Sequence, residues 1–337
     1  MDERENLIQQ LINIAGSYRH GQIDPFNEAH VNTWLAQFNP GVQLDLLREL
    51  VFTLRQTYYS EQKLESEIRD FLNPTEERRN FLTSNTFLDI QQRGSSQHDM
   101  LQIASRVLTQ AYGVQANINT VSQSNNYTYL DDGIFTGKRV EQDISNWIEN
   151  HAPVNATLYI ISLYSHAYGE YATENTIRQI VRNSQKNIEV VWRTRLKVED
   201  RLARINVSDV LRPTHSPNEP AVNAYIAQMR YNPRFREPGS RGMNNFFSSE
   251  PGRSAVEQEF LKAGVHIRQI CPNLNLRQRP LGNSALDTLG FGSMIITYRN
   301  CPNNAPLALW VGDPWYPLFP RMTNAESDNR RLLNVFL

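Results

Sequence analysis

The stretch YTYLDDGIFTGKRV, residues 127–140, decides how this chain is interpreted. Residues 127–130 are mostly apolar and predict a short strand, and residues 138–148 have the amphipathic spacing of a helix. Two adjacent acids, Asp131 and Asp132, follow the strand directly. A strand that ends in polar residues before a glycine-containing turn and a helix is typical of a ligand site at the carboxyl edge of a parallel sheet.

The residue types in this turn indicate the ligand. The first amides of a helix attract an anion, and Gly137 lets the backbone approach a phosphate closely. Thr136 adds a hydroxyl donor and Lys138 a positive charge. Asp131 and Asp132 would repel that phosphate, so they suit ribose hydroxyls or a divalent cation one sugar's length away. The run therefore predicts a site for a ribose 5-phosphate.

The run resembles the signature of the type I phosphoribosyltransferases, in which a strand leads to two acids, two mainly apolar residues and a Thr-Gly turn. The resemblance implies that Asp131 and Asp132 are catalytic and bind Mg²⁺, the expected cofactor, and that Gly133 contacts the substrate. Two positions depart from the family. Arg139 replaces a usual Thr, which exchanges a hydroxyl for a charge at a substrate-binding position. Phe135 replaces the acidic general base of purine-salvage members, which excludes a proton relay from that position. A Rossmann-like turn with chance acids is the alternative.

A second loop fits the same family. FLDIQQRGSSQHDMLQIASRVL, residues 87–108, has the strand–loop–helix form that holds pyrophosphate in type I enzymes. The resemblance implies that Arg93 is catalytic, that Gly94 and Ser95 bind substrate, and that Ser96 is a further donor. A solvated turn is the alternative for this loop.

The residues after a later strand are candidates for holding the base. Residues 156–164, ATLYIISLY, predict a buried strand, and His166 follows it closely. In relatives the loop after the corresponding strand often contacts the base, so His166 is expected to bind substrate. Tyr164, Ser165 and Tyr168 are weaker candidates of the same kind.

The order of elements predicts the fold class, α/β. Between residues 81 and 210 predicted strands alternate with predicted helices, which favours a parallel sheet. The further strands are expected at 86–90, 114–118 and 188–192, and the further helices at 99–111 and 174–183. We therefore expect a phosphoribosyltransferase-like core over 81–210, a helical N-terminal region over 1–80, and an appended C-terminal α+β region over 211–337 that packs on or covers the site.

The flanking regions carry predictions of their own. Helices are expected at 3–18 and 44–72, either as a partner-docking module or as a packing layer. After residue 211 we expect a helix at 249–264 and strands at 293–298 and 308–311. An arginine cluster could supply charge to phosphates or belong to a solvated loop: Arg230, Arg234, Arg236 and Arg241.

Charge and cysteine content narrow the class of protein. The net charge of -1 argues against non-specific nucleic-acid binding by the whole molecule. The start is polar, unlike a signal peptide, and no apolar run reaches the roughly 20 residues of a membrane span, so no membrane partner is expected. The only cysteines, Cys271 and Cys301, are far from any paired metal spacing, which favours a reducing, cytoplasmic location.

Later blocks carry a narrower resemblance. FFSSEPGRSAVEQEFLKAG, LGFGSMIITYRNCPNNAPLALW and PWYPLFPR are similar to phosphoribosyltransferase-like proteins of prokaryotic conflict systems, some encoded beside retron reverse transcriptases. This resemblance implies a role in anti-phage defence, with a reverse transcriptase and non-coding nucleic acid, or other defence proteins, as partners.

The expected function is that of an enzyme or effector. It would bind phosphoribosyl pyrophosphate or a nucleotide with magnesium and react at the ribose anomeric carbon, by phosphoribosyl transfer or by cleavage of an N-glycoside. The alternative is a catalytically weak nucleotide-sensing or partner-binding module of a defence complex.

Overall fold

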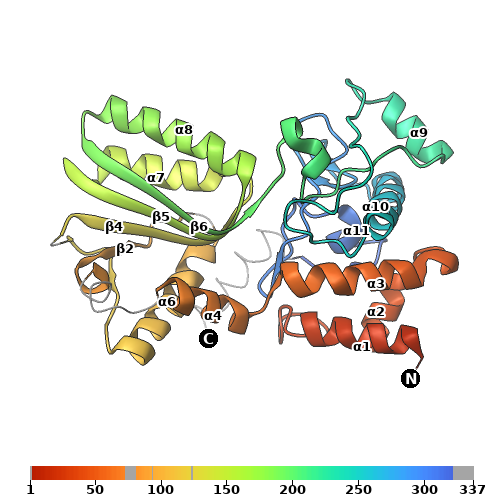
Figure 1. Ribbon diagram of the computed structural model, residues 1–337, viewed down its shortest axis with the longest axis horizontal. Coiled ribbons are helices and arrows are strands. Elements are labelled where there is room, and N and C mark those ends of the chain that lie inside the picture. The colour runs from red at the N-terminus through yellow and green to blue at the C-terminus, as the bar shows by residue number, and fades with distance from the viewer. Residues whose placement is uncertain (1, 73–80, 93, 123, 322–337) are drawn as a thin grey trace. The chain divides into compact units, whose positions relative to one another are not determined.

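A computed structural model describes residues 2–72, 81–92, 94–122 and 124–321 (Figure 1). The chain forms two compact units. One comprises residues 62–198, and the other combines residues 1–61 with residues 199–337. The sequence predicts three consecutive regions. It gives no local pattern from which the association of residues 1–61 with residues 199–337 could be predicted.

The unit of residues 62–198 is built on a five-stranded parallel sheet with the strand order β3-β2-β4-β5-β6. The strands are β2 (Thr86–Leu88), β3 (Asn117–Ile118), β4 (Asn126–Ile134), β5 (Asn155–His166) and β6 (Asn187–Val198). The helices are α4 (Glu61–Phe71), α6 (Ser96–Tyr112), α7 (Lys138–Asn150) and α8 (Ala167–Ser184). Helices α7 and α8 lie on one side of the sheet and α6 lies on the other (Figure 1). The predicted α/β class and parallel sheet are confirmed.

The core of this unit follows from the sequence pattern. Helix α7 places Val140, Ile144 and Trp147 on one buried face, the spacing of an amphipathic helix. Strand β5 contributes Leu158 and Ile160, which are at most 1% exposed. These side chains belong to one apolar cluster. This packed core holds the strands that carry the candidate site.

Two predicted boundaries at the carboxyl edge are wrong. Strand β4 continues through the acids to Ile134, where the sequence predicts an end at Leu130. Helix α8 begins at Ala167, directly after β5, where the sequence predicts a loop as far as Glu174. The segment AYGEYAT suggests a loop because it is polar and contains Gly169. That glycine, however, lies in the helix where the backbone of Phe135 crosses it, since an added Cβ would lie 1.9 Å from the Phe135 carbonyl oxygen.

The second unit joins an early and a late segment of the chain. Its N-terminal elements are α1 (Glu3–Ala15), α2 (Glu28–Leu35), α3 (Pro40–Thr57) and β1 (Tyr58–Tyr59). Its later elements are η1 (Leu202–Val207), α9 (Pro220–Ala227), α10 (Glu250–Ile270), β7 (Gln278–Arg279), β8 (Gly282–Asn283), β9 (Ile296–Thr297) and α11 (Leu307–Trp310). Strand β1 pairs in parallel with β9, and the Trp34 indole donates to the Ala308 carbonyl at 2.8 Å. The N-terminal helices are thus a packing layer for the C-terminal segment.

Three predictions in this unit are wrong. Residues 44–72 form α3 and α4 with the short strand β1 between them, because Tyr58 and Tyr59 leave the helix to pair with β9. Residues 308–311 belong largely to the helical turn α11, not to a strand. Gly264 lies inside α10 and does not end it, since the backbone of Pro280 packs within 2.6 Å of where its Cβ would be.

The second unit also holds a buried charge network. Glu257 accepts from Arg236 and from Arg253, each at 2.8 Å, and all three side chains have 0% exposure. Arg236 is therefore a structural residue, not part of a solvated loop. Within the residues that the structure describes, none of the helices has the combined length and apolar character that crossing a membrane requires.

Candidate active site

Strand β4 carries the two acids. Asp131 pairs with Ser162 of β5, and the strand ends three residues later at Ile134. Only 3% of Asp131 and 7% of Asp132 is exposed, and Asp131 Oδ1 accepts from the Asp132 amide at 2.9 Å. Both acids therefore lie at the carboxyl end of a strand that has neighbours on both sides, the edge where open α/β sheets bind ligands.

The two carboxylates lie on opposite faces of the sheet. The Tyr129 hydroxyl donates to Asp143 Oδ2 of α7 at 3.2 Å. Because successive strand side chains alternate, Asp131 lies on the same face as Tyr129, toward α7, and Asp132 lies on the other. The two acids can therefore contact different parts of one ligand at the strand end.

The turn between β4 and α7 depends on Gly137. This residue has φ 72°, and an added Cβ would lie 1.7 Å from Thr173 Oγ1 and 2.7 Å from the Gly169 carbonyl oxygen, both in α8. Gly133 is also restricted, because its Cβ would lie 1.8 Å from the Tyr164 ring. The turn therefore packs directly on α8 and is held in a single position.

The N-terminus of α7 faces solvent. Gly137 is the N-cap and supplies no side chain, and Thr136, Lys138 and Arg139 are exposed. The first amides of a helix lack intrahelical acceptors. Lys138 pairs with Glu141 one turn along. Free amides, a hydroxyl and two cations thus gather at one helix end, which is a suitable arrangement for a phosphate.

The loop after β2 lies beside this end, because β2 is the neighbour of β4 in the sheet. Gln97 is fully buried, and its Oε1 accepts from the amides of Ile90 and Gln91 at 2.8 and 2.9 Å. A Cβ on Gly94, whose φ is 89°, would lie 3.6 Å from Arg139 Nη1. The two predicted ligand loops therefore meet at Gly94 and Arg139.

The other predicted residues of this loop are less defined. Ser95 is the N-cap of α6 and makes no side-chain capping bond. The Ser96 hydroxyl is hydrogen-bonded to the side-chain amide group of Gln91. Arg93 lies outside the described residues, so its predicted role in catalysis stays a prediction. Gln97 was not predicted; a glutamine at the start of an apolar helix face is the signal that could have found it.

Asp143 is a second residue that the sequence interpretation missed. It is 5% exposed and accepts from Tyr129 and from the Gln92 amide, so it ties β4 and the loop after β2 to α7. Burial raises the pKa of the Asp143 carboxyl, against the effect of these hydrogen bonds and of the Arg139 charge. The available signal was an acid inside the apolar stripe of a helix, three residues after Val140.

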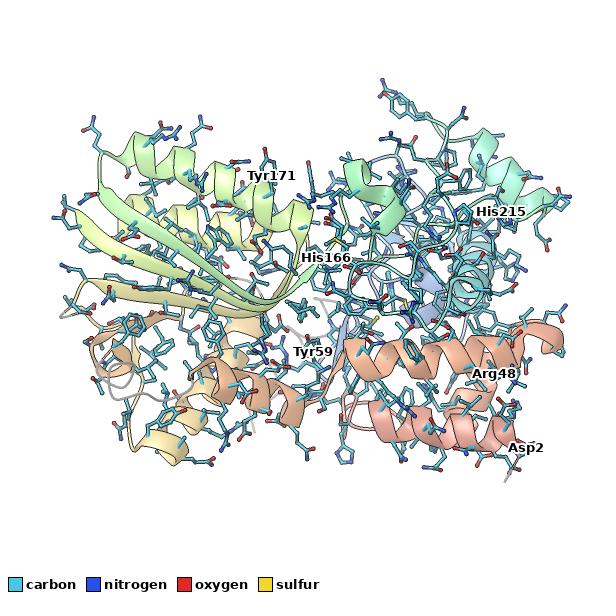
Figure 2. The ribbon with its side chains drawn as sticks, viewed as in Figure 1. Asp2, Arg48, Tyr59, His166, Tyr171 and His215 are labelled. Carbon is cyan, nitrogen blue, oxygen red and sulfur yellow. The ribbon has the colours of Figure 1, made fainter. Side chains whose placement is uncertain are left out.

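The end of β5 places His166 differently from the expectation. His166 lies where β5 passes into α8 (Figure 2), and none of it is exposed. The Phe135 ring stacks on the imidazole, with centroids 5.1 Å apart and an angle of 28° between the ring planes. Because the imidazole is fully buried in this arrangement, a substrate contact by His166 stays a prediction.

A buried carboxylate, that of Glu170, lies four residues after His166. Glu170 of α8 is 7% exposed and pairs with Lys197 Nζ of β6 at 2.6 Å. It also accepts from Thr194 at 3.0 Å and from Ser165. Burial would raise the pKa of the Glu170 carboxyl, but the hydrogen bonds and the Lys197 charge outweigh it and hold the pKa below its usual value. Ser165, a weaker candidate for the base, is thereby bound to Glu170.

The described residues offer few protein ligands for a magnesium ion. They contain no group of three or more His, Cys, Asp or Glu side chains placed to hold a metal. Since Asp131 and Asp132 lie on opposite faces, one ion would contact at most one of them directly. Mg²⁺ is often bound by one carboxylate together with substrate phosphates and water, so either acid fits that arrangement.

Fold and site together define the class. A parallel sheet whose central strand ends in two acids, followed by a glycine turn and an open helix N-terminus, is the arrangement of a phosphoribosyltransferase-like protein. A comparison with family models agrees: the model of the PRTase-CE family matches residues 31–321, and the chain belongs to this family. None of the curated proteins searched matches the chain. The matched range covers the sheet and most of the second unit, and the family suggests phosphoribosyl transfer in general.

Proposed function

We propose that the chain binds phosphoribosyl pyrophosphate, or a nucleotide, at the carboxyl edge of the sheet and reacts at the ribose anomeric carbon. The observation that carries the proposal is the meeting of three features. These are the buried acids at the end of β4, the open N-terminus of α7, and the Gly94 loop beside Arg139. Their spacing along one sheet edge suits a ligand with a phosphate at each end of a sugar.

Each feature has a distinct role in this proposal. The amides after Gly137, with Thr136 and Lys138, bind the 5-phosphate. Asp131 and Asp132 orient the ribose through its hydroxyls, and the loop at Gly94 and Ser95 receives the pyrophosphate. The chain contributes orientation of the sugar and charge near the leaving group, since no acidic general base stands at position 135. Arg139, beside Gly94, and Arg93 would stabilise the departing pyrophosphate, and Mg²⁺, when bound, would add charge there.

A second function has its own support. Phe135 stacks on the buried His166, and position 135 carries no titratable group. A site that binds a phosphoribosyl ligand but lacks an acidic general base at position 135 can serve as a nucleotide sensor with little turnover. The two candidates differ in the fate of the ligand: an enzyme releases pyrophosphate or a free base, and a sensor returns its ligand unchanged.

The resemblance of the later blocks supports a biological setting. We propose that the protein acts in the cytoplasm in anti-phage defence, with a reverse transcriptase and non-coding nucleic acid, or other defence proteins, as partners. Phage plating with wild type and with the Asp131→Asn, Asp132→Asn double variant tests this setting. Equal protection by both proteins would show that neither acid is needed for defence.

Isothermal titration with phosphoribosyl pyrophosphate and Mg²⁺ tests the binding site. Wild type is expected to give saturable binding, and the Asp131→Asn, Asp132→Asn variant to bind at least about 10-fold more weakly, a loss of about 1.4 kcal/mol. Glu189→Gln is the matched control, because Glu189 lies at the opposite end of the same sheet, paired with Thr157. Equal binding by the double variant, or equal loss in the control, would contradict the proposed site.

A further inference from the structure

Strand β6 is a long strand at one edge of the five-stranded sheet. It has 12 residues, whereas β3 at the other edge has two. One side of β6 is paired along its length with β5 (Figure 1). A long edge strand presents a row of main-chain N–H and C=O groups with which another strand can pair.

The odd-numbered residues of β6 direct their main-chain groups toward β5. The Asn187 amide donates to the Val154 carbonyl, just before β5, at 2.7 Å. Because successive residues of a strand point their main-chain groups to opposite sides, the even-numbered residues point theirs outward. The Arg193 guanidinium agrees with this, since it donates to the Trp192 carbonyl at 3.1 Å.

Five residues of β6 therefore present main-chain groups to the outside of the sheet. They are Ile188, Val190, Trp192, Thr194 and Leu196. Within the part of the chain that the structure describes, their amides have no main-chain acceptor, because β5 is the strand with which β6 pairs. The outer edge of β6 is thus a place where a further strand can add to the sheet.

Charge is distributed unevenly along the exposed side chains of this strand. Glu189 lies in its first half, and the second half carries the cations Arg193, Arg195 and Lys197. Arg195 and Lys197 also pair with acids of their own unit, but among the described residues no ion pair involves Glu189 or Arg193. The strand has a negative end and a positive end, which are complementary when two copies run in opposite directions.

We infer that two copies of the chain associate by antiparallel pairing of their β6 strands about a two-fold axis at Trp192. In this register each outward-facing residue lies opposite an outward-facing residue of the other copy, which the hydrogen-bonded pairs of an antiparallel ladder require. The pairs are Trp192 with Trp192, Val190 with Thr194, and Ile188 with Leu196. The two sheets then form one continuous sheet, and the two-fold symmetry limits the assembly to a dimer.

The side chains fit the same register. Residues directly opposite each other in an antiparallel pair have Cβ atoms about 4.5–5.5 Å apart, and long side chains also reach the diagonal neighbours. Glu189 of each copy is then opposite Arg195 of the other copy and diagonal to Arg193. Arg195 is accessible for this contact, because half of its side chain is exposed although it pairs with Glu67. Each dimer gains two such contacts between opposite charges.

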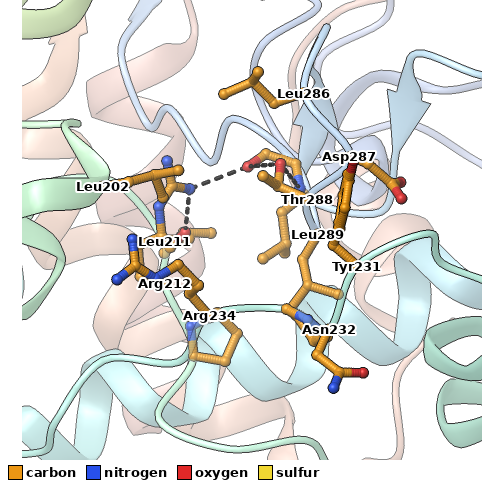
Figure 3. A pocket seen from close by; sticks show the side chains of 14 residues that line it. Leu202, Leu211, Arg212, Tyr231, Asn232, Arg234, Leu286, Asp287, Thr288 and Leu289 are labelled. Carbon is orange, nitrogen blue, oxygen red and sulfur yellow. Dashed lines mark hydrogen bonds between the residues drawn. The ribbon is translucent and has the colours of Figure 1, made fainter.

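The cavity of the second unit has charged groups that are already bonded. It has a volume of about 250 Å³, and Arg212 and Asp287 line it (Figure 3). Arg212 Nη1 donates to the carbonyls of Leu211 and Gly290 at 3.0 and 3.1 Å. Asp287 pairs with Arg279 at 2.7 Å. These groups stabilise the loops around the cavity, so the edge of β6 is the stronger place for a partner.

Analytical ultracentrifugation of the full chain tests the association. A species with twice the 38.9 kDa mass of the chain is expected to accumulate between about 1 and 100 µM, because main-chain pairing with little apolar core gives moderate affinity. A chain that stays monomeric over this range would overturn the inference.

Charge reversal at opposite positions identifies the interface. Glu189→Lys places two pairs of cations opposite each other in each dimer, and Arg195→Glu places two pairs of acids. Each variant alone should therefore dimerise about 10-fold or more weakly than wild type. In an equal mixture the two variants should form a heterodimer about as tightly as wild type, because both pairs become attractive again. Unfolding temperatures check that each variant is folded.

Matched controls change the same charges elsewhere on the unit. Glu149→Lys in α7 and Arg182→Glu in α8 alter exposed residues outside β6, and they should dimerise like wild type. Equal weakening by these controls, dimers that neither β6 variant affects, or a mixture no tighter than the separate variants would each overturn the assignment. The result is independent of phosphoribosyl binding, since the proposed ligand site is built from other residues.

Discussion

At the scale of single residues, Gly137 is required both by its positive φ and by its close packing against α8. The variant Gly137→Ala should destabilise the fold by about 2–4 kcal/mol, because φ 72° strains an alanine and the new Cβ meets Thr173. Gly113→Ala is the control, since Gly113 has φ 63° but nothing within 4 Å, and it should cost only about 1–2 kcal/mol. Urea unfolding measures both. Equal losses would mean that the close approach to α8 contributes nothing.

Asp143 allows a test of a buried acceptor. Replacing it with Leu leaves the Tyr129 hydroxyl and the Gln92 amide without their acceptor, which should cost about 1–3 kcal/mol. Asp143→Asn keeps an acceptor oxygen and removes the charge that burial disfavours, so its stability at pH 7 should stay within about 1 kcal/mol of wild type. Because the folded pKa is raised, the advantage of Asn should vanish as the pH falls below that pKa. A larger loss for Asn than for Leu would contradict this role.

Single residues also show how far the sequence leads. The places of Asp131, Gly137 and Lys138 near the end of β4 and at the start of α7 were predictable because the strand–turn–helix pattern is local, and their roles toward a sugar and a phosphate stay predictions. Asp143 and Gln97 are recognisable as polar residues on apolar helix faces, but their roles were not predictable, because their partners include the backbone amides of Gln92, Ile90 and Gln91, and a backbone amide leaves no trace in the residue types. His166 was placed at the right strand end, but its burial and its stacking with Phe135 depend on contacts between elements.

At the scale of elements, Glu170 joins α8 to β5 and β6. Its lowered pKa implies stability that is fully present above the unperturbed value of 4.5 and is lost as the pH falls through the folded value. Wild type should therefore lose stability below about pH 4.5, and Glu170→Gln should lose less over that range. Urea unfolding at pH 7 and at pH 3.5 to 4.5 measures the difference. Parallel pH profiles for the two proteins would exclude this contribution.

The elements themselves were predictable to unequal degrees. The β-α alternation and the start of α7 at Lys138 follow from local periodicity and the Gly137 turn. The extension of β4 through the acids does not, because it depends on pairing with β5. The early start of α8 also depends on a contact between elements. Gly169 suggests a break in the helix, but a glycine is needed there because the Phe135 backbone passes close to it.

At the scale of the whole molecule, an early and a late segment of the chain form one unit, held by pairings such as β1 with β9 and Tyr18 with the Cys301 amide at 3.0 Å. The sequence contains no local sign of these pairings. The PRTase-CE match over residues 31–321 covers both units, so the family is defined by more than the sheet.

The buried network of this unit yields a prediction. Glu257→Gln leaves Arg236 and Arg253 without their shared counter-charge and should cost about 3–5 kcal/mol. Glu259→Gln, which loses only a partly exposed partner in Lys262, should cost about 1 kcal/mol or less. Thermal unfolding compares the two variants. Similar midpoints would show that the network does not depend on the Glu257 charge.

Hydrogen exchange with and without phosphoribosyl pyrophosphate and Mg²⁺ tests the central claim most directly. The proposed site predicts slower amide exchange in peptides that cover residues 90–97 and 131–139, where the two loops meet, and no such change in the Asp131→Asn, Asp132→Asn variant. Protection confined to residues 199–321, or binding with no protection in either loop, would contradict the account.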